Sequence, residues 1–320
     1  MPTLKDIENA YERIKCMINQ TNVMTSRTLN KMVEADVFLK CENFQRVGAF
    51  KFRGVSNKLI QLNDKDRKKG VITHSSGNHA QAVALASSII GIKSIIVMPK
   101  NAPKVKVDAT KGYGAKIVRC ASNVEAREKT CQDIIKKNGY TLIHPYDDEQ
   151  IIAGAGTAAL ELLREIGFID YIFCPVGGGG LLSGTSIATK GLFPNTKVIA
   201  VEPKQADDAY RSYRDKKLYP SNYPNTIADG LRTSLSRRTF KIILKNVDNI
   251  ITVSEKEIID AMKFLWLRMK IIVEPSGAVP IAGIMKMKSS IKKSKVGAII
   301  SGGNINLNDF FNEYYNNISK

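Results

Sequence analysis

The chain has 320 residues, of which 43% are hydrophobic and 24% charged. That composition is typical of a globular protein with enough apolar material for one large domain or two modest ones. No apolar run reaches the ~18 residues of a membrane span, and no secretory or transit signal is evident, so we expect no membrane association. The net charge of +18 invites a nucleic-acid partner. The lysines are spread along the chain, however, and aromatic residues make up only 7%. We therefore interpret the charge as a solvated basic surface and expect no nucleic-acid binding.

Cysteine usage indicates the compartment. The chain contains five cysteines, an odd number, and no CxxC spacing that would suggest a zinc site. They are widely scattered, at Cys16, Cys41, Cys120, Cys131 and Cys174. This pattern suits reduced thiols better than a disulfide framework. We therefore expect a cytoplasmic protein.

Short β-branched runs alternate with longer amphipathic stretches along most of the chain. The predicted strands are, in chain order, 71–74, 94–98, 116–120, 141–144, 171–176, 197–201, 249–253 and 296–301. Predicted helices between them include 80–90, 125–137, 157–166 and 255–270. Short apolar strands separated by helices indicate βαβ units and a parallel sheet that is buried on both faces. The sequence therefore predicts an α/β fold.

The predicted domains are interleaved rather than strung end to end, because no Pro-, Gly- or Ser-rich linker and no internal repeat divides the sequence. We expect a small α/β domain over residues 70–147, inserted into a large domain formed by residues 1–69 and 148–320.

Three predicted strands end in polar or glycine-rich turns that open helices, at residues 74–79, 177–180 and 301–304. In open parallel sheets, ligands bind beyond the carboxyl ends of the strands, at helix N-termini. Three such turns predict one cleft that is assembled from distant segments.

The run Gly177, Gly178, Gly179 and Gly180 follows an apolar strand and precedes a helix near Leu181. Glycines let consecutive backbone N–H groups converge on an anion, so we expect a phosphate there. A flexible turn and a dinucleotide site are the alternatives. GGGGLLSG does not match GxGxxG at its third glycine, and GAGTAA at residues 154–159 lies in a helical pattern rather than after a strand.

Two further features are ambiguous on their own. Lys51 is flanked by aromatic and small residues, and an amine in apolar surroundings has a lowered pKa and can form a Schiff base; an exposed lysine is the ordinary alternative. The polar turn at residues 74–79 could hold a carboxylate at a helix N-terminus. A plain helix N-cap, which needs only one such side chain, is the alternative there.

Seven ordered motifs together resemble the fold-type-II pyridoxal-phosphate (PLP) family, within it the serine racemases and serine/threonine dehydratases. They are GAFKFRG, THSSGNHAQA, PVGGGGLLSG, VEPKQADDAY, TIADG, IVEPSGA and ISGGN. The resemblance runs from about residue 4 to residue 305. It implies two open, twisted, mostly parallel sheets flanked by helices, a mobile small domain, and a cofactor in the cleft between the domains.

Carried over motif by motif, the resemblance implies the following roles. Lys51 would carry the cofactor and act as one base, and Ser76 would act as the second base on the opposite face of the substrate Cα. The other cofactor-binding residues would be Phe50, Asn78, Gly177, Gly178, Gly179, Gly180, Leu181 and Ser301. The substrate carboxylate would be held by Ser75, Ser76, Asn78, His79 and Arg127. A neutral serine at the pyridine nitrogen would favour elimination and proton transfer over transamination.

The resemblance also implies two accessory sites. Glu202 and Asp208, whose spacing alone is equally that of a solvated surface, match a divalent-cation site for Mg²⁺, Mn²⁺ or Ca²⁺, with the Ala206 carbonyl as third ligand. A nucleotide site for ATP would use Thr25, Ser26, Arg46, Val47, Lys106 and Asn304. Arg46 and Val47 depart from the lysine and threonine of that pattern.

The resemblance implies an enzyme that acts on a small hydroxy amino acid, as a homodimer. We expect a serine racemase that also dehydrates serine to pyruvate and ammonia. L-Threonine dehydratase and threo-3-hydroxyaspartate ammonia-lyase are the near alternatives, because Tyr146 stands where mammalian-type racemases carry asparagine. A nicotinamide-dependent dehydrogenase is the alternative from a different class.

Overall fold

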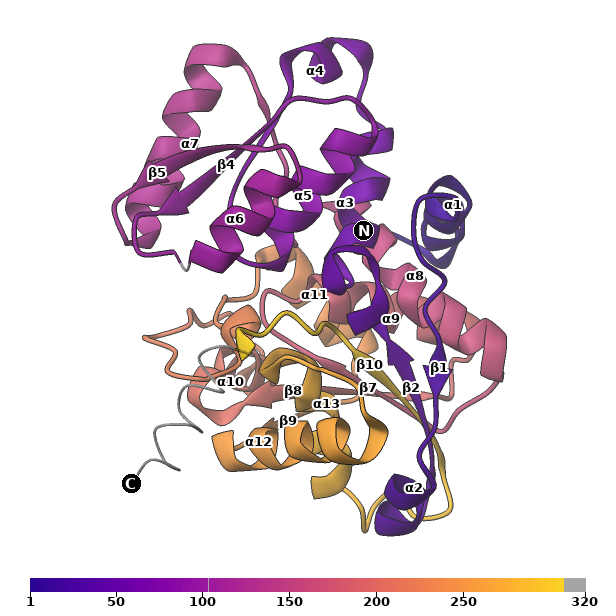
Figure 1. Ribbon diagram of the computed structural model, residues 1–320. Helices are drawn as coiled ribbons and strands as arrows, with labels where there is room; N and C mark the ends of the chain where they lie inside the picture. Colours follow the sequence, from indigo (N-terminus) through magenta and orange to yellow (C-terminus); the bar gives the residue numbers. More distant parts are fainter. Residues whose placement is uncertain (103, 308–320) are drawn as a thin grey trace, which may run out of the picture.

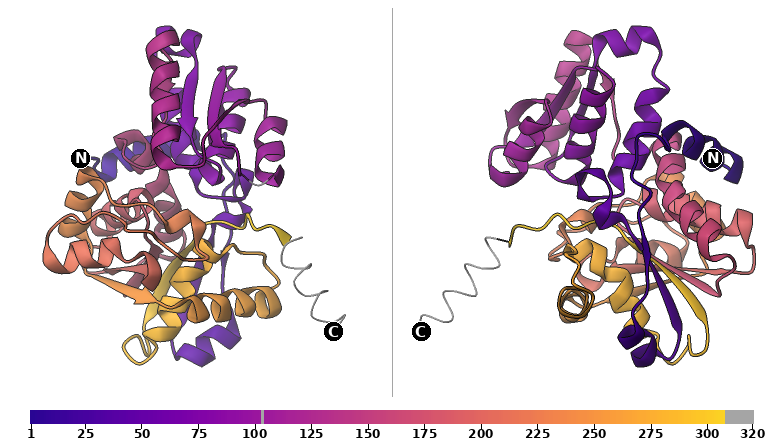
Figure 2. Two further views of the ribbon diagram at one scale, coloured as in Figure 1. Left: turned by 90° about the vertical axis from the view of Figure 1, so that its left-hand side faces the viewer. Right: turned by 45° about the vertical axis from the view of Figure 1, so that its right-hand side comes forward.

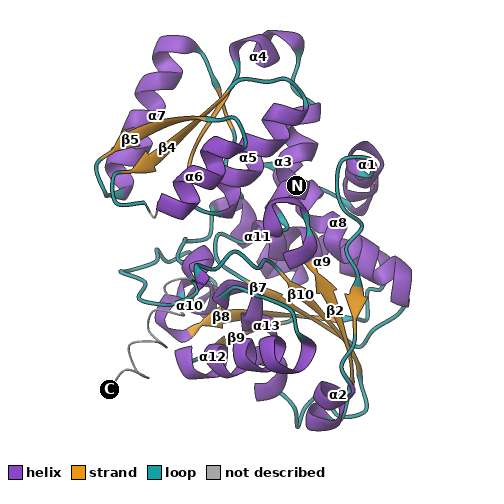
Figure 3. Ribbon diagram, in the orientation of Figure 1, coloured by secondary structure: helices purple, strands orange, loops and turns teal. Residues whose placement is uncertain are grey.

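Two open sheets organise the computed structural model, which describes residues 1–102 and 104–307 (Figures 1 and 3). The strands in these residues are β1 (Val23–Met24), β2 (Asp36–Cys41), β3 (Val71–His74), β4 (Ser94–Pro99), β5 (Lys116–Cys120), β6 (Thr141–Leu142), β7 (Tyr171–Pro175), β8 (Lys197–Pro203), β9 (Asn249–Val253) and β10 (Lys295–Ile300). The larger sheet has the order β1-β2-β10-β7-β8-β9, and the smaller one the order β5-β4-β3-β6. All pairs are parallel except β1 with β2. The predicted α/β fold with two mostly parallel sheets is confirmed.

The α-helices cover these sheets. They are α1 (Leu4–Ile14), α2 (Arg27–Val33), α3 (Lys51–Ile60), α4 (Asp64–Lys69), α5 (Asn78–Ile89), α6 (Lys104–Gly112), α7 (Val124–Asn138), α8 (Glu149–Ile166), α9 (Gly180–Leu192), α10 (Asp208–Asp215), α11 (Arg237–Asn246), α12 (Glu255–Phe264) and α13 (Pro275–Lys286). The helix predicted from residue 157 begins earlier, because Asp148 caps it by accepting from the Gln150 and Ile151 N–H groups. The helix predicted to reach residue 270 ends as an α-helix at Phe264 and continues as a π-helix over Leu265–Met269.

Segments from both ends of the chain share the larger sheet, as Figure 2 shows. Val296 of β10 lies opposite Val37 of β2 on one side and Tyr171 of β7 on the other. Strands β1 and β2 were not predicted, since β2 carries Lys40 among its buried residues. The smaller sheet is built from residues 71–142, and helix α3 shares the apolar core with α5. The domain boundaries at residues 70 and 147 stay a prediction.

Helices α3, α8 and α9 pack closely because glycines lie where they cross. A Cβ at Gly54 would lie 2.7 Å from the Ile151 carbonyl oxygen, and a Cβ at Gly154 would lie 2.7 Å from the Arg53 carbonyl oxygen. A Cβ at Gly156 would meet Gly184 of α9 at 2.8 Å. The GAGTAA segment is therefore a helix-packing surface inside α8, not a nucleotide loop. This packing fixes the start of α3 relative to the start of α9.

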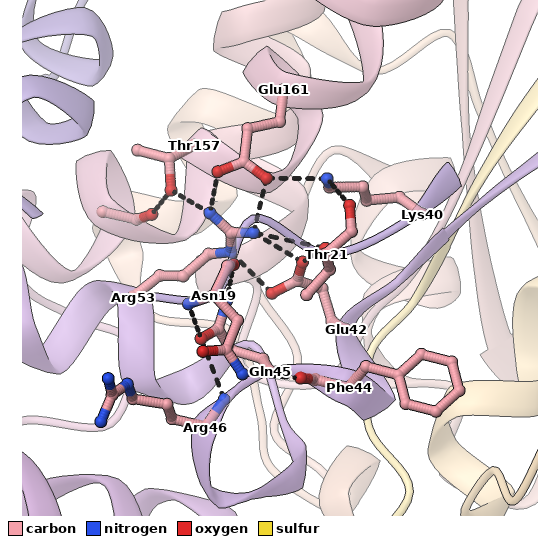
Figure 4. Close-up of polar contacts among 11 residues, drawn as sticks. Asn19, Thr21, Lys40, Glu42, Phe44, Gln45, Arg46, Arg53, Thr157 and Glu161 are labelled. Carbon is pink, nitrogen blue, oxygen red and sulfur yellow. Dashed lines mark hydrogen bonds and ion pairs between the residues drawn. The ribbon is translucent and has the colours of Figure 1, made fainter. Parts of the chain in front are cut away.

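A buried ionic cluster also anchors α3 (Figure 4). The Arg53 guanidinium bonds to both carboxylate oxygens of Glu42 and of Glu161, at 2.6–2.8 Å. The Lys40 Nζ lies 2.7 Å from Glu161 and donates to the Thr21 carbonyl. All four charged side chains are nearly or fully buried. The two cations balance the two carboxylates, so the cluster as a whole is electrically neutral. It joins β2, α3 and α8 two residues from Lys51.

Among the described residues, no helix is long and apolar enough to cross a bilayer. All five cysteines are free thiols, and only Cys16 is exposed.

Candidate active site

A cleft lies between the smaller lobe, which holds the four-stranded sheet, and the larger lobe, which holds the six-stranded sheet. All nine predicted cofactor residues line it. Its lining comes from the starts of α3, α5, α9 and α13, the carboxyl ends of β7 and β10, and the intervening loops. The lining residues are Phe50, Lys51, Asn78, Tyr146, Pro175, Gly177, Gly178, Gly179, Gly180, Leu181, Leu182, Gly230, Leu231, Thr233, Glu274, Ser276 and Ser301. Strands β7 and β10 are parallel neighbours, so the glycine run and Ser301 emerge at the same edge of the sheet.

Lys51 is the first residue of α3 and points into this cleft. The Phe50 N–H donates to the Ser301 carbonyl at 3.0 Å, which ties the start of the helix to the end of β10. The Lys51 Nζ donates to the Pro145 carbonyl at 2.8 Å and lies 5.1 Å from the centre of the Phe50 ring. Burial lowers the pKa of Lys51 to about 8, although the nearby Glu274 carboxylate opposes the shift. An amine with this pKa is unprotonated often enough near neutral pH to attack an aldehyde.

The glycine run forms a cradle that side chains would fill. Gly179 has φ +84° and is the N-cap of α9, and no side chain caps this helix. A Cβ at Gly179 would lie 2.8 Å from Leu235 and Thr239, and a Cβ at Gly177 would lie 2.9 Å from Leu231. The N–H groups of the first helical turn therefore remain available to an anion, and the helix dipole favours one there. The cradle fits the phosphate of PLP.

Asn78 belongs to a hydrogen-bonded group that the sequence only partly indicated. Its Nδ2 donates to Glu274 Oε1 at 2.8 Å, and its Oδ1 accepts from Asn304 Nδ2 at 2.9 Å. Burial raises the pKa of Glu274 to about 8, with the Asp229 charge adding to the shift. Sequence reasoning missed Glu274 as a cleft residue, although the IVEPSGA motif contains it. The available signal was the position of Glu274 directly before Pro275, at the start of the apolar helix α13.

The serine-rich turn after β3 lies at the start of α5. Gly77 is the N-cap residue, and no side chain caps the helix, so the plain N-cap interpretation is wrong. Ser75 Oγ accepts from the Gly77 N–H at 3.3 Å. His79 is buried, and its Nε2 bonds to the Ile143 carbonyl at 2.9 Å. As the second residue of α5, it has a backbone N–H that lacks an intrahelical partner. Ser75, Ser76 and His79 are not among the residues that line the cleft in this conformation.

Arg127 lies on α7 of the smaller lobe and does not line the cleft either. Its charge acts on His74, whose pKa is lowered mainly by burial and partly by Arg127. The predicted contact of Arg127 with the substrate therefore stays a prediction.

The three residues of the predicted cation site lie at the end of β8, which contains Glu202, and in the turn that leads to α10, which contains Ala206 and ends at Asp208. Glu202 and Asp208 are buried, and so is Ala206. Glu202 accepts from the Ala209 and Tyr210 N–H groups at 3.0 and 2.8 Å, whereas Asp208 Oδ1 has no partner. Burial and the Asp208 charge raise the pKa of Glu202, and burial raises the pKa of Asp208 to about 6.

An unpartnered carboxylate oxygen beside a second buried carboxylate fits a hard cation. The described residues contain no group of three or more His, Cys, Asp or Glu side chains arranged for a metal ion. Backbone oxygens and water would have to complete the shell.

The predicted nucleotide residues are only partly brought together. Asn304 Nδ2 donates to the Val47 carbonyl at 2.6 Å, and Arg46 precedes Val47. Ser26 caps α2 and follows Thr25, whereas Lys106 of α6 pairs with Asp229 at 2.7 Å. Helices α2 and α6 lie far apart in Figure 1.

Comparisons with known proteins identify the family of this chain. The family model described as pyridoxal-phosphate dependent enzyme matches residues 14–302. The chain is 49% identical to a serine racemase of Schizosaccharomyces pombe over 308 residues, 96% of this chain and 95% of that protein. It is 47% identical to an L-threo-3-hydroxyaspartate ammonia-lyase of Saccharomyces cerevisiae over 308 residues, 96% of this chain and 94% of that protein.

Among solved structures, that of maize serine racemase superposes with a TM-score of 0.95 at 41% identity, covering 99% of this chain and 98% of that chain. The serine racemase of Dictyostelium discoideum gives a TM-score of 0.91 at 48% identity, covering 95% of this chain and 99% of that chain. The chain therefore belongs to the pyridoxal-phosphate-dependent enzymes of fold type II, in the group of racemases and ammonia-lyases.

Proposed function

We propose that this enzyme is a serine racemase that also dehydrates serine to pyruvate and ammonia. The observation that carries the proposal is the joint placement of the Lys51 amine and the glycine cradle in one cleft. A relative at 47% identity that is named as a hydroxyaspartate ammonia-lyase supports a second candidate, the dehydration of threo-3-hydroxyaspartate. L-Threonine dehydratase activity is a third candidate of the same chemistry.

PLP bound in this cleft would supply an electron sink that acidifies the substrate Cα–H bond. The glycine cradle would hold its phosphate, Asn78 would bond to its ring hydroxyl, and Ser301 would face its ring nitrogen. Phe50 and Leu181 would pack beside it. A serine side chain supplies no negative charge to keep that nitrogen protonated, which favours proton transfer and elimination.

We assign the proton transfers to two side chains from opposite lobes. The Lys51 amine, whose pKa is lowered to about 8, would remove or return the Cα proton on one face. Ser76, in the turn before α5, would do so on the other face. Return of the proton from the opposite face inverts the centre, whereas loss of the β-hydroxyl gives the dehydrated product. Ser75, Asn78, His79 and Arg127 would hold the carboxylate after the lobes approach each other.

The accessory assignments are proposals as well. A Mg²⁺, Mn²⁺ or Ca²⁺ ion bound by Glu202, Ala206 and Asp208 would neutralise two buried carboxylates in the larger lobe. ATP would act as an activator only in a homodimer that brings Thr25, Ser26, Arg46, Val47, Lys106 and Asn304 into one site. The five free thiols favour the cytoplasm.

The test is spectroscopic and chemical. The purified protein, incubated with pyridoxal phosphate, should gain a visible absorption band that borohydride bleaches. Mass spectrometry should then find the reduced cofactor attached to Lys51. Lys51→Ala should abolish the band, whereas Lys256→Ala, at an exposed lysine (84% exposed side chain), should keep it. Protein that stays colourless overturns the proposal.

Product assays decide among the candidate reactions. L-Serine, threonine and threo-3-hydroxyaspartate are supplied in turn, and D-serine, pyruvate, oxobutyrate and oxaloacetate are measured. D-Serine formation from L-serine supports the racemase. Oxaloacetate as the main product, without D-serine, supports the hydroxyaspartate ammonia-lyase instead.

A further inference from the structure

The segment that crosses from the smaller lobe to the larger one, residues 143–148, borders the cleft. It joins β6 to α8 and contributes two features to the site. The Pro145 carbonyl accepts the hydrogen bond from Lys51 Nζ at 2.8 Å. Tyr146 lines the cleft and packs on the glycine run, where a Cβ at Gly180 would lie 2.8 Å from the Tyr146 Cβ.

The His144 side chain holds this crossing segment in shape. Its Nδ1 accepts from the Asp147 N–H at 2.8 Å and from the Tyr146 N–H at 3.3 Å. Its ring meets the Tyr146 ring edge to face, with centroids 4.8 Å apart and an interplanar angle of 86°. Both hydrogen bonds need a lone pair on Nδ1, so the imidazole must be neutral with its proton on Nε2.

We propose that His144 is a positioning residue: as a neutral imidazole it fixes the turn that presents the Pro145 carbonyl to Lys51 and sets Tyr146 against the glycine cradle. The inference rests on the proposed function, because it concerns the same cofactor site. His144 acts through its neighbours, since it does not line the cleft itself.

The surroundings of His144 favour the neutral ring. Burial is the main cause that lowers its pKa, and the charges of His74 and Lys51 lower it further, while Asp147 and Asp148 act in the opposite direction. His74 in turn faces Glu128, which raises the pKa of that ring, and Arg127, which lowers it. All three histidines of the chain lie in this region.

Neighbouring contacts hold the other parts of the same segment. The His79 Nε2 bonds to the Ile143 carbonyl at 2.9 Å. Asp148 caps α8 and pairs with Lys58 at 2.7 Å. Asp147 lies 3.5 Å from Arg238 of α11. The imidazole itself bonds to the Tyr146 and Asp147 N–H groups, so a change at position 144 acts first on residues 145–147.

The experiment compares two variants with opposite expectations. An asparagine carbonyl oxygen can accept from the N–H two residues later, as in an Asx turn, so His144→Asn should preserve the turn. His144→Leu keeps the bulk and offers no acceptor. The control is Asn63→Ala, which removes a side-chain acceptor for the Asp66 N–H on the distant helix α4.

Two measurements report on the site without turnover. The first is the dissociation constant of pyridoxal phosphate, which His144→Leu should raise by about tenfold, because Tyr146 loses the one to two hydrogen bonds of the turn that hold it against the glycine run. The second is the rate at which an amine-reactive reagent labels Lys51 in the cofactor-free protein, followed by mass spectrometry. His144→Leu should raise that rate several-fold, because the ammonium loses its carbonyl acceptor. His144→Asn and Asn63→Ala should match the unchanged protein in both.

The outcomes separate this inference from the proposed function. If the unchanged protein does not bind pyridoxal phosphate, the proposed function fails. If it binds the cofactor and His144→Leu matches it in affinity and labelling, the positioning role is wrong while the function stands. Equal damage by His144→Leu and His144→Asn would also overturn the role, because it would show that the acceptor atom is not what matters. Circular dichroism of each variant checks that a change in affinity is not a loss of fold.

Discussion

Arg53→Ala is expected to be one of the most destabilising single substitutions in the chain. The guanidinium makes four hydrogen bonds of 2.6–2.8 Å to Glu42 and Glu161 and lies in the buried cluster of Figure 4. Burial raises the pKa of Glu42, but the Arg53 charge and hydrogen bonds outweigh it and hold the pKa below its ordinary value. Without Arg53, Glu161 keeps its ion pair with Lys40, whereas Glu42 keeps the Thr21 hydroxyl and the weaker influence of the Lys40 charge.

The magnitude follows from the charge that is left behind. Removing one partner of a buried ion pair costs about 3–5 kcal/mol, because the other charge stays buried and uncompensated. That is a large part of the roughly 5–15 kcal/mol by which a domain is stable. Lys256→Ala is the matched surface control. It breaks an ion pair with Asp260 whose side chains are 84% and 54% exposed, and such pairs contribute about 0.5 kcal/mol or less.

Urea unfolding, followed by far-UV circular dichroism, measures the difference. With a denaturant slope of roughly 3 kcal/mol per molar, Arg53→Ala should lower the midpoint by about 1–2 M. Arg53→Met combined with Glu42→Gln should be milder than Arg53→Ala, because no carboxylate then remains unpaired at position 42. A loss of less than about 1 kcal/mol for Arg53→Ala would refute the reasoning, since it would mean that water reaches Glu42 and compensates its charge.

Three further predictions concern catalysis, metal and pH. Ser76→Ala should abolish D-serine formation from L-serine while some pyruvate formation remains; equal loss of both products in the same assay would contradict the two-base scheme. Excess EDTA should lower the thermal unfolding temperature, because Asp208 Oδ1 and Glu202 are then buried without a cation, and Asp208→Asn should remove this response; an identical melting curve with and without EDTA argues against the cation site. Acidification should destabilise the fold through His79, whose pKa is lowered from 6.5 to about 3, mainly by burial. The unfolded chain binds a proton near pH 6.5 and the folded chain only near pH 3, so this stabilisation is complete above about pH 6.5 and is lost as the pH falls toward 3, by about 2 kcal/mol at pH 5. His79→Gln should flatten the dependence of the urea midpoint on pH, and an unchanged slope would assign the acid sensitivity to other groups.

The sequence by itself determined the features that depend on local pattern. Buried strands appear in the sequence as short β-branched runs. The eight predicted strands are all present, within a few residues of their predicted bounds. The glycine run predicts a close approach of the backbone to a ligand, because a residue with a Cβ would not fit where backbone and ligand are that close. Lys51 was identified by the family motif around it. Its burial could not be identified in this way, because the adjacent residues in the sequence do not show whether a lysine is buried.

The tertiary structure decided which polar groups leave water and what they meet there. Strand β2 was not predicted, because a lysine such as Lys40 is typical of a surface position. In the folded chain Lys40 is buried and pairs with Glu161, which is more than a hundred residues later in the sequence. In the sequence, Glu274 and His144 look like ordinary helix-start and loop residues, yet Glu274 bonds to Asn78 and His144 to the Asp147 N–H. The contact of Tyr146 with the glycine run also appears only in the folded chain. A side chain's pKa and hydrogen bonds depend on burial and on neighbours that are distant in sequence, so only the folded chain assigns them.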